Sequence, residues 1–369
     1  MPNVVQLEFF PSRTLTVYLA RLFTTRILAV LFMLVLVLQM LDLLGESGDI
    51  LAHPGNGQAQ LLYYVSLRMP QLVARFLPYS VLLATIITLA TLNQNSEVIS
   101  MKAAGLSAHQ VLAPLILTAL VIAGFSFAFN ERVVTRATAT LNAWQAVEYG
   151  PIPKSAGVRN NLYLAEGRDI LLAATVTGTG PRMVMDQVTY YRRDTNGMIV
   201  EQLRAPRAVF ANPGWRLDKP VRFDVPKVQS AQLASAVVAK AITPERIAIS
   251  GVDADGEDLF TLTHSIDAMQ LAGRRTSELQ AAWWHKLSGP LSAALMPLLG
   301  AVAAFGLARS GQLLIRAVIG MALGFAYFVL DNAALAMGNF GGYPPFVAAW
   351  APFLLFALIG ETVLIRTEE

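Results

Sequence analysis

The residues that could carry out covalent or metal chemistry are few in this 369-residue chain. There is no cysteine, which excludes a disulfide framework and a thiolate nucleophile. The chain has neither the G-x-x-x-x-G-K-S/T loop that cradles nucleotide phosphates nor a G-x-S-x-G nucleophile elbow. The sequence therefore predicts a protein that is not an enzyme, uses no cofactor and holds no metal; the four histidines, His53, His109, His264 and His285, are scattered.

One acid, Asp331, lies well inside a late apolar stretch. An ionisable group within a bilayer is costly and is by default a hypothesis about function. Because Asn332 stands beside it, a hydrogen bond between packed helices is the simpler interpretation. A proton relay would need a second such group.

The segment Leu92–Gln110, LNQNSEVISMKAAGLSAHQ, has the pattern of a short helix between two apolar stretches. Asn95 or Ser96 can cap a helix that starts near Glu97. The acid in the first turn suits the positive end of the helix dipole. Gly105 is expected to end this helix.

The apolar face of this short helix is formed by Val98, Met101 and, one turn on, Ala104 or Gly105. An amphipathic helix between two spans can dock into a groove of a partner protein. It can also lie on lipid headgroups, although such helices usually carry more basic residues than the single Lys102 found here.

The composition indicates a membrane protein. With 54% hydrophobic and 14% charged residues and a mean hydropathy of +0.50, the chain is too apolar for a soluble protein of this length. The net charge of +3 is small and no basic run is interleaved with aromatics, so we expect no nucleic-acid partner. We predict an α-helical integral membrane protein with six transmembrane helices, since six stretches reach about the 17–25 residues that a bilayer demands: Ile27–Leu44, Phe76–Leu92, Val111–Phe129, Leu287–Leu307, Ala317–Met337 and Phe346–Ile365.

The distribution of Arg and Lys predicts the orientation. Two short loops on one side, Glu46–Gln60 and Gly338–Pro345, contain neither residue, so both termini should be cytoplasmic and the central domain outside. The stretch Leu61–Arg75, which contains Pro70, is interpreted as a short interfacial helix before the second span. The basic residues on the cytoplasmic side are Arg13, Arg21, Arg26, Lys102, Arg309, Arg316 and Arg366.

Residues 130–280 form a polar insertion between the two transmembrane halves, 1–129 and 281–369, and are predicted to be all-β and jelly-roll-like. Asn196-Gly197 between two apolar runs is a strong hairpin signal. Two short helices should follow, in DLFTLTHSIDAMQLAG and RRTSELQAAWW. The expected strands are Asp169–Val176, Met183–Arg193, Met198–Leu203 and Val221–Val225, separated by turns at Asn160-Asn161, Gly178–Pro181, Asp194–Gly197 and Asn212–Gly214.

Several segments of the chain resemble those of a known family. NSEVISMKAAGLS is similar to the coupling-helix segment of the lipopolysaccharide-export permeases LptF and LptG, and WHKLSGPLS (Trp284–Ser292) to the family's W-x-K-x-x-x-P-L-S. GFAYFVLDNAALAMG (Gly324–Gly338), followed by YPPFVAAWAP, resembles the LptG branch more than the LptF branch. The order of three spans, an outer β domain and three further spans resembles the family over nearly the whole chain.

The resemblance implies a half-transporter in the bacterial inner membrane. An LptF-like permease and an LptB-like ATPase dimer would be its partners, and lipopolysaccharide would pass to an LptC/LptA-like periplasmic bridge. The coupling helix would be residues 95–105, with Glu97 at the groove of the ATPase, Val98 and Met101 as apolar anchors, and Gly105 at its end. The alternatives are the LptF paralogue, a related lipid-export permease, or a membrane receptor or scaffold with a periplasmic sensing domain.

The resemblance also implies cations that bind the phosphorylated headgroup of the lipid. This chain departs from the family at the outer end of the first span, where Gln39, Asp42, Glu46 and Asp49 stand in place of frequent lysines. The remaining candidates are Arg132, Arg136, Arg274, Arg275, Lys286 and Arg68, with Arg75 nearby; snorkelling anchors are the alternative interpretation of each.

Overall fold

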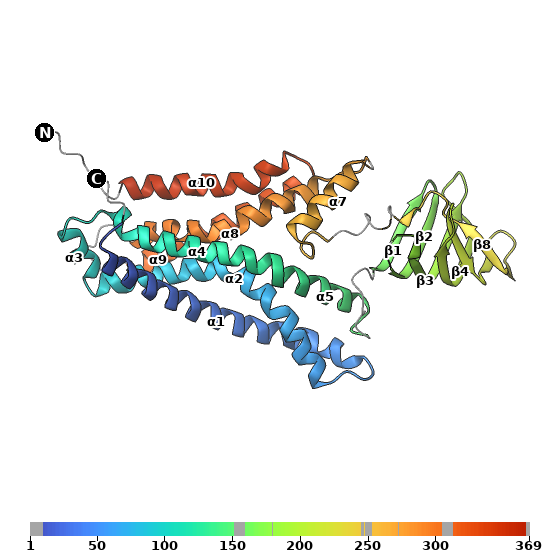
Figure 1. The fold of residues 1–369 in the computed structure, drawn as a ribbon, viewed down its shortest axis with the longest axis horizontal. Helices are drawn as coiled ribbons and strands as arrows, with labels where there is room; N and C mark the ends of the chain where they lie inside the picture. The colour runs from blue at the N-terminus through green and yellow to red at the C-terminus, as the bar shows by residue number, and fades with distance from the viewer. Residues whose placement is uncertain are drawn as a thin grey trace. The chain divides into compact units, whose positions relative to one another are not determined.

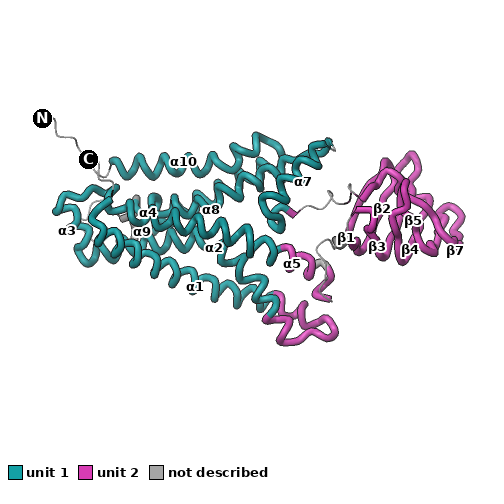
Figure 2. Tube along the Cα trace, viewed as in Figure 1, with its two compact units in different colours: residues 1–45, 63–138, 254–369 teal, residues 46–62, 139–253 magenta. Residues whose placement is uncertain are grey.

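The computed structural model describes residues 10–150, 159–178, 180–244, 247, 253–271, 273–304 and 313–366. The chain divides into two compact units (Figure 2): residues 1–45, 63–138 and 254–369 form the first, and residues 46–62 and 139–253 form the second. The helices (Figure 1) are α1 (Arg13–Ala52), α2 (Gln58–Gln94), α3 (Glu97–Ala103), α4 (Ala108–Phe129), the π-helix η1 (Asn130–Val134), α5 (Thr135–Ala146), α7 (Leu259–Leu271), α8 (Ser277–Ala304), α9 (Leu313–Asn339) and α10 (Pro345–Arg366).

Five helical stretches in the described part of the chain are long and apolar enough to cross a membrane. The predicted span Leu287–Leu307 overlaps α8, which is not among the five and which the structure describes only as far as Ala304. The sixth span therefore stays a prediction. The five stretches are Arg13–Ala52, Gln58–Gln94, Ala108–Gln145, Val318–Asn339 and Pro345–Arg366.

Helix α1 has 40 residues, which at 1.5 Å per residue gives a length of about 60 Å, roughly twice a hydrocarbon core. Between Leu19 and Val35 its buried side chains recur at every fourth position, which places them in one row along the helix. These five side chains belong to the apolar core of the helical unit: Leu19, Phe23, Ile27, Leu31 and Val35.

The prediction of a separate interfacial helix at Leu61–Arg75 is wrong. These residues belong to the continuous helix α2, which runs through Pro70 and Pro78. A proline inside a helix removes one hydrogen bond and costs about 3 kcal/mol. Buried residues on both sides of Pro78, among them Leu72 and Val81, show that packing holds the helix together across this point.

Helical structure also occupies both ends of the predicted β domain. From residue 130 the chain continues α4 through η1 and α5 to Ala146, and the first strand begins only at Arg159. At the other end α7 confirms the first predicted short helix, but RRTSELQAAWW is not a separate one, because Ser277 onward forms the start of the long α8. Residues 130–146 are therefore corrected from β to helix.

Among the described residues, the β-sheet of the second unit has eight antiparallel strands, six of them in the order β1-β2-β3-β4-β5-β8. One half of β4 pairs with β5 and the other half with β6, which in turn pairs with β7. The predicted jelly roll stays a prediction. The strands are β1 (Arg159–Glu166), β2 (Asp169–Thr177), β3 (Val184–Arg193), β4 (Ile199–Phe210), β5 (Trp215–Asp218), β6 (Val221–Asp224), β7 (Gln229–Gln232) and β8 (Ser235–Val238).

The hairpin between β3 and β4 confirms the signal at Asn196-Gly197. The Asp194 carboxylate accepts hydrogen bonds of 2.9 Å from the backbone N–H groups of Asn196 and Met198, and Gly197 has a φ of +82°. Glycine suits that backbone conformation because it has no side chain to clash. The turn predicted at Asn160-Asn161 is wrong, because both residues lie within β1.

The core of the sheet is centred on Trp215, which is fully buried. Its indole Nε1–H donates a 2.7 Å hydrogen bond to the carbonyl oxygen of Ile242. Leu217, two residues along β5, is also fully buried, while Arg216 and Asp218 between and beyond them are exposed. This alternation of period two marks a strand with one face on the core.

Replacing Trp215 by alanine should destabilise the sheet by about 3–5 kcal/mol, because it leaves a cavity and an unpaired carbonyl. The matched control is Tyr163→Ala on β1, where the side chain is 60% exposed and little packing is lost. Limited proteolysis of the full chain in detergent, followed by mass spectrometry, reports opening of residues 159–238. Equal cleavage rates in the two variants would contradict the central role given to Trp215.

Candidate functional site

The helical unit places the predicted coupling segment at one end of its bundle. Helix α3 lies where α1 begins and α10 ends, and α7 lies at the opposite end (Figure 1). The N-terminal end of α1, the C-terminal end of α10 and the Leu92–Gln110 loop therefore share one side of this unit.

Helix α3 confirms the short helix predicted in this loop. Ser96 precedes it with a φ of +59°. Its side chain makes no capping hydrogen bond, so Ser96 does not cap the helix through its side chain. At the other end Gly105 has a φ of +87°, and the N–H groups of Gly105 and Leu106 donate to the carbonyls of Lys102 and Met101. This pair of bonds is a Schellman motif, so Gly105 ends the helix as predicted.

The Glu97 carboxylate at the start of α3 is held by two side chains. The Tyr18 hydroxyl of α1 donates a 3.1 Å hydrogen bond to Oε2, and the Asn95 amide donates one of 3.4 Å to Oε1. Helix α1 thus orients Glu97, for which the family resemblance implies a contact with the ATPase.

The side chains of Val98 and Met101 face the protein's own core, where they are 5% and 8% exposed. The idea that they anchor a partner is therefore corrected: in this structure they attach α3 to the bundle. Ile99 is instead 54% exposed, and Lys102 and Ala103 are exposed with it. The exposed surface of α3 consists of Ile99, Ser100, Lys102 and Ala103.

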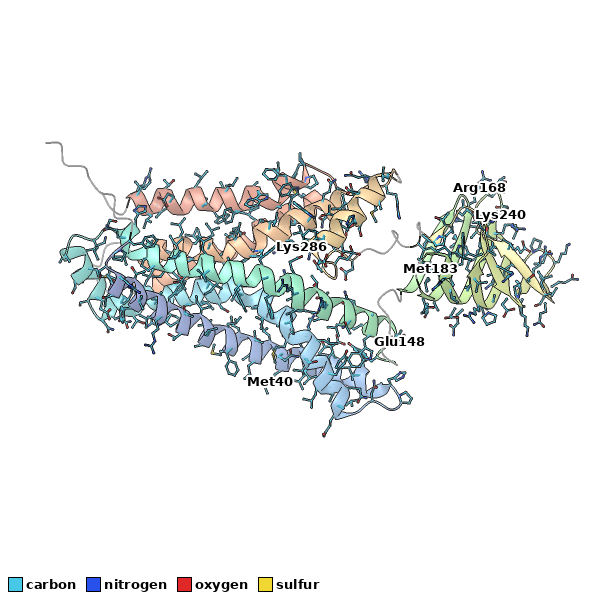
Figure 3. All side chains as sticks on the ribbon, in the orientation of Figure 1. Met40, Glu148, Arg168, Met183, Lys240 and Lys286 are labelled. Atoms are coloured by element: carbon cyan, nitrogen blue, oxygen red, sulfur yellow. The ribbon has the colours of Figure 1, made fainter. Side chains whose placement is uncertain are left out.

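At the opposite end of the helical unit Lys286 of α8 forms an ion pair with Glu131 of η1, 3.4 Å from Nζ to Oε1. Both side chains are largely buried, at 9% and 15% exposed. The other carboxylate oxygen, Oε2, accepts a 2.6 Å hydrogen bond from the N–H of Leu259. One carboxylate therefore joins η1 to the start of α7 and to α8, and Lys286 (Figure 3) is occupied by it.

The first turn of α7 is capped by Asp258, whose carboxylate accepts a 2.7 Å hydrogen bond from the N–H of Thr261. Hydrogen bonds from Thr261 lower the pKa of Asp258 below its ordinary value. The acid thus stays ionised at the positive end of the helix.

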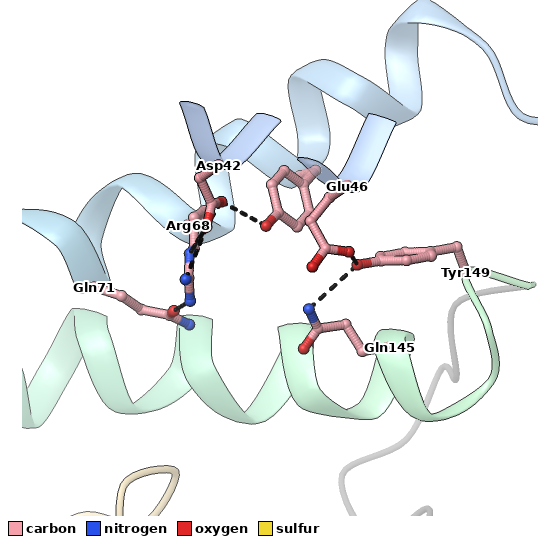
Figure 4. Close-up of polar contacts among 7 residues, drawn as sticks. Asp42, Glu46, Arg68, Gln71, Gln145 and Tyr149 are labelled. Carbon is pink, nitrogen blue, oxygen red and sulfur yellow. Dashed lines mark hydrogen bonds and ion pairs between the residues drawn. The ribbon is translucent and has the colours of Figure 1, made fainter. Parts of the chain in front are cut away.

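Arg68 is also paired. Its guanidinium donates two hydrogen bonds, of 3.1 and 2.9 Å, to Oδ1 of Asp42 and one of 2.7 Å to Gln71, while the Tyr64 hydroxyl donates 2.6 Å to Oδ2 of Asp42 (Figure 4). Asp42 therefore neutralises the charge of Arg68, which makes this guanidinium a weaker ligand for a phosphate. The four other candidates, Arg132, Arg136, Arg274 and Arg275, are exposed.

In the second unit Glu46 has a role that the sequence did not reveal. The Tyr149 hydroxyl donates a short hydrogen bond to Glu46 and accepts one of 3.2 Å from Gln145 (Figure 4). Burial and the Glu46 carboxylate raise the pKa of Tyr149 to about 12. A cavity of about 570 Å³ beside it is acidic and unsuited to a phosphate; it is lined by Glu46, Asp49, Ala52, His53, Pro54, Gln145, Glu148 and Tyr149.

No three His, Asp or Glu side chains of the described residues come close enough together to hold a metal ion. The arrangement as a whole offers binding surfaces rather than reacting groups. The apolar bundle carries the exposed face of α3 at one end and exposed arginines near the other.

Comparison with known proteins identifies the family. The family described as "Lipopolysaccharide export system permease LptF/LptG" matches residues 17–366 of this chain. The chain belongs to the LptF/LptG family. The match covers both helical halves and the inserted sheet, so the resemblance seen in the motifs is confirmed.

Two relatives illustrate the branch. The lipopolysaccharide export system permease protein LptG of Escherichia coli (strain K12) is 26% identical over 365 residues, which cover 96% of this chain and 99% of the relative. LptG of Haemophilus influenzae (strain ATCC 51907 / DSM 11121 / KW20 / Rd) is 23% identical over 316 residues, 84% of this chain and 87% of the relative. Both relatives carry the LptG name, which agrees with the branch indicated by the motifs.

Sequence reasoning missed Glu131 because an acid next to a helix end usually faces water. The available signal was Lys286: two opposite charges at the water ends of two apolar stretches can meet when those helices pack. The π-helical turn that carries Glu131 has no signature in the sequence, although such turns often mark functional positions.

Removing one partner of the Glu131–Lys286 pair should leave a buried, uncompensated charge and cost about 3–5 kcal/mol. We expect Glu131→Gln and Lys286→Met each to lower the thermal unfolding midpoint in detergent by several degrees. The double variant should lose less than the sum of both. As a control, Lys227→Met breaks a 3.8 Å pair with Asp224 in which the lysine is 71% exposed, and should change the midpoint little. Additive losses in the double variant would mean that the two groups do not interact.

Proposed function

We propose that this chain is the LptG-type permease subunit of the ABC transporter that extracts lipopolysaccharide from the bacterial inner membrane and passes it to the periplasmic bridge. The observation that carries the proposal is the family match over residues 17–366. It is supported by the membrane-spanning character of five helices and by the inserted antiparallel sheet.

The proposal includes a sixth span, formed by α8, and a jelly-roll-like periplasmic domain within residues 130–280. An even number of spans puts both termini on the same side of the membrane, which we take to be the cytoplasmic side. The positive charges of Arg13, Arg21 and Arg26 near the start of α1 support that orientation. The same side carries α3.

A wide apolar path follows from the chemistry of the cargo. Moving a lipid chain into water costs about 0.8 kcal/mol per CH₂, so several acyl chains require an apolar route throughout. Helix α1 presents large exposed apolar side chains outside its buried row, such as Phe32 at 70% exposed. Met40, labelled in Figure 3, is 62% exposed. Helix α9 does the same with Phe325 and Val329. Facing an LptF-like permease, these surfaces would enclose the lipid.

The energy source lies outside this chain in the proposal. A nucleotide-binding loop is absent from the sequence. An LptB-like ATPase dimer would act on the exposed α3 surface of Ile99, Ser100, Lys102 and Ala103, with Glu97 beside it. Because Val98 and Met101 attach α3 to the bundle, a push on α3 reaches the membrane helices directly.

Headgroup contacts are assigned to exposed cations. Arg132, Arg136, Arg274 and Arg275 remain candidates, and snorkelling to the interface is the competing role. In this proposal Arg68 and Lys286 stabilise the helix bundle through their ion pairs with Asp42 and Glu131.

The cargo is tested by photo-crosslinking in membranes that contain the complete transporter. A crosslinking amino acid at Phe32 or Phe325 should capture lipopolysaccharide, because both positions are exposed on the surfaces assigned to the cavity. The matched controls are Phe23 and Phe356, buried at 0% and 3% exposed, which should capture no lipid. Capture of phospholipid alone at Phe32 and Phe325 would remove lipopolysaccharide as the cargo.

The coupling surface is tested by co-purification with the ATPase. We expect Glu97→Lys and Ile99→Asp each to reduce the recovered ATPase about tenfold or more, which corresponds to a loss of about 1.4 kcal/mol of binding free energy. The control Asp267→Lys reverses an exposed acid on α7, at the other end of the same unit, and should leave recovery unchanged. An unchanged yield with both α3 variants would exclude α3 as the contact.

A further inference from the structure

A histidine and a buried acid meet between α8 and α9. Nε2 of His285 on α8 and Oδ2 of Asp331 on α9 are 3.1 Å apart, which is hydrogen-bond distance. The sequence indicated a hydrogen bond between packed helices for Asp331, and this contact confirms it. The His285 side chain is 35% exposed, whereas Asp331 as a whole is 7% exposed. The contact therefore starts at the surface of the helical unit and ends inside it.

A second polar contact joins the same two helices. The Tyr327 hydroxyl on α9 is hydrogen-bonded to the side chain of Ser292 on α8, and the two residues are 1% and 3% exposed. Tyr327 precedes Asp331 by four residues, and Ser288 and Ser292 follow His285 by three and seven. These spacings place the polar groups of each helix on one face. We call these five residues, His285, Ser288, Ser292, Tyr327 and Asp331, the polar seam.

Two atoms of the polar seam are buried without a hydrogen-bond partner among the described residues. They are Oδ1 of Asp331 and the hydroxyl oxygen of Ser288, a residue that is 2% exposed. A buried polar atom without a partner is rare in proteins, because it has given up its hydrogen bonds to water and received nothing in return. Both atoms therefore indicate a further hydrogen-bonding group between α8 and α9.

The spacing along α8 suits a single bridging molecule. Ser288 lies three residues beyond His285, about 4.5 Å along the helix axis, and His285 contacts the other oxygen of the same carboxyl group. A water molecule joins two oxygens that are about 4.5 Å apart, since each O–H···O bond is about 2.8 Å long. Water can donate one hydrogen bond to Oδ1 and make another with the hydroxyl, whichever way that hydroxyl points.

Water can reach the polar seam from its exposed end. Trp283 and Trp284, directly before His285, have the side chains that are enriched where a membrane meets water. His285 is the most exposed member of the polar seam, and Ser288 follows it one helical turn further along α8. The interface thus lies next to the two unpartnered atoms.

We propose that the polar seam binds one structural water molecule, which donates a hydrogen bond to Oδ1 of Asp331 and is hydrogen-bonded to the Ser288 hydroxyl. Buried waters in proteins occupy such positions, where they satisfy polar groups that the chain leaves without partners. The water adds a third polar contact between α8 and α9, between the His285–Asp331 and Ser292–Tyr327 contacts. The proposal does not depend on the cargo or on the ATPase, and it goes beyond the transport role.

The sign of one substitution tests the proposal in the purified full chain in detergent. Ser288→Ala should lower the thermal unfolding midpoint by a few degrees, because the water loses a partner and Asp331 loses a well-held donor. If the Ser288 hydroxyl bound nothing, its removal would relieve an unsatisfied group and raise the midpoint or leave it unchanged.

The matched control is Ser80→Ala on α2. Ser80 is also fully buried, but its hydroxyl donates a 2.9 Å hydrogen bond to the carbonyl oxygen of Phe76 in its own helix. The substitution removes the same atoms without touching the polar seam, so its midpoint should stay near that of the wild-type chain. A midpoint of Ser288→Ala equal to or above that of Ser80→Ala overturns the proposal.

Coupling to the acid gives a second readout. Because the water links the two side chains, Ser288→Ala should cost clearly less in an Asp331→Leu background than in the wild-type chain, while Ser80→Ala should cost the same in both. Equal costs of Ser288→Ala in the two backgrounds contradict the bridge. If Asp331→Leu does not fold, the comparison of Ser288→Ala with Ser80→Ala still decides.

A crystal of the full chain in a lipid mesophase, at a resolution that shows ordered water, gives the direct readout. We expect a solvent peak within hydrogen-bond distance of both Oδ1 of Asp331 and the Ser288 hydroxyl, and its loss in Ser288→Ala. A direct hydrogen bond between these two side chains, or the absence of a peak in a map that shows other ordered waters, overturns the proposal. Failure of lipopolysaccharide capture at Phe32 would affect the proposed function and leave these measurements intact.

Discussion

Ion pairs between partly or largely buried charges join the helices of the helical unit. Glu131 with Lys286 joins two helices that are distant in the sequence, and Asp42 with Arg68 joins the consecutive helices α1 and α2. In a bundle whose contacts are otherwise apolar, van der Waals packing alone gives little preference for one register of helices over another. A buried ion pair has a low energy only in the register that brings its two partners together, so these pairs specify the arrangement. The same pairs remove Arg68 and Lys286 from the cations that a phosphorylated lipid could use.

Unlike the ion pairs, the large exposed apolar side chains of α1 and α9 do not specify one arrangement of helices. Such surfaces are acceptable in contact with lipid tails or with a second apolar helix bundle, and they impose no register. A permease that must open to admit a multi-chain lipid needs surfaces of this type on its moving faces. The division between specific polar pairs inside the bundle and unspecific apolar faces outside it agrees with a half-transporter.

The sequence allowed much of this organisation to be predicted, and the errors have physical causes. Apolar length identified five of the spans, and Asn196-Gly197 identified the hairpin, because both signals are local. Leu61–Arg75, which contains Pro70, was interpreted as a short interfacial helix, but it is part of the long helix α2, where packing outweighs the hydrogen bond that a proline removes. Val98 and Met101 were assigned to a partner because periodicity gives an apolar face without stating what covers it. The partners of Asp331 and Glu131 depend on how distant helices pack, which no local pattern encodes.

The π-helical turn η1 has a geometric consequence for the region beyond it. Successive residues of an α-helix are about 100° apart around its axis, so one residue inserted into a turn shifts the facing of all later side chains by about that angle. Without η1, Leu141 and Trp144 of α5, now almost fully buried, would face a different direction. The inserted residue therefore rotates the facing of every later α5 side chain relative to the regular repeat of α4.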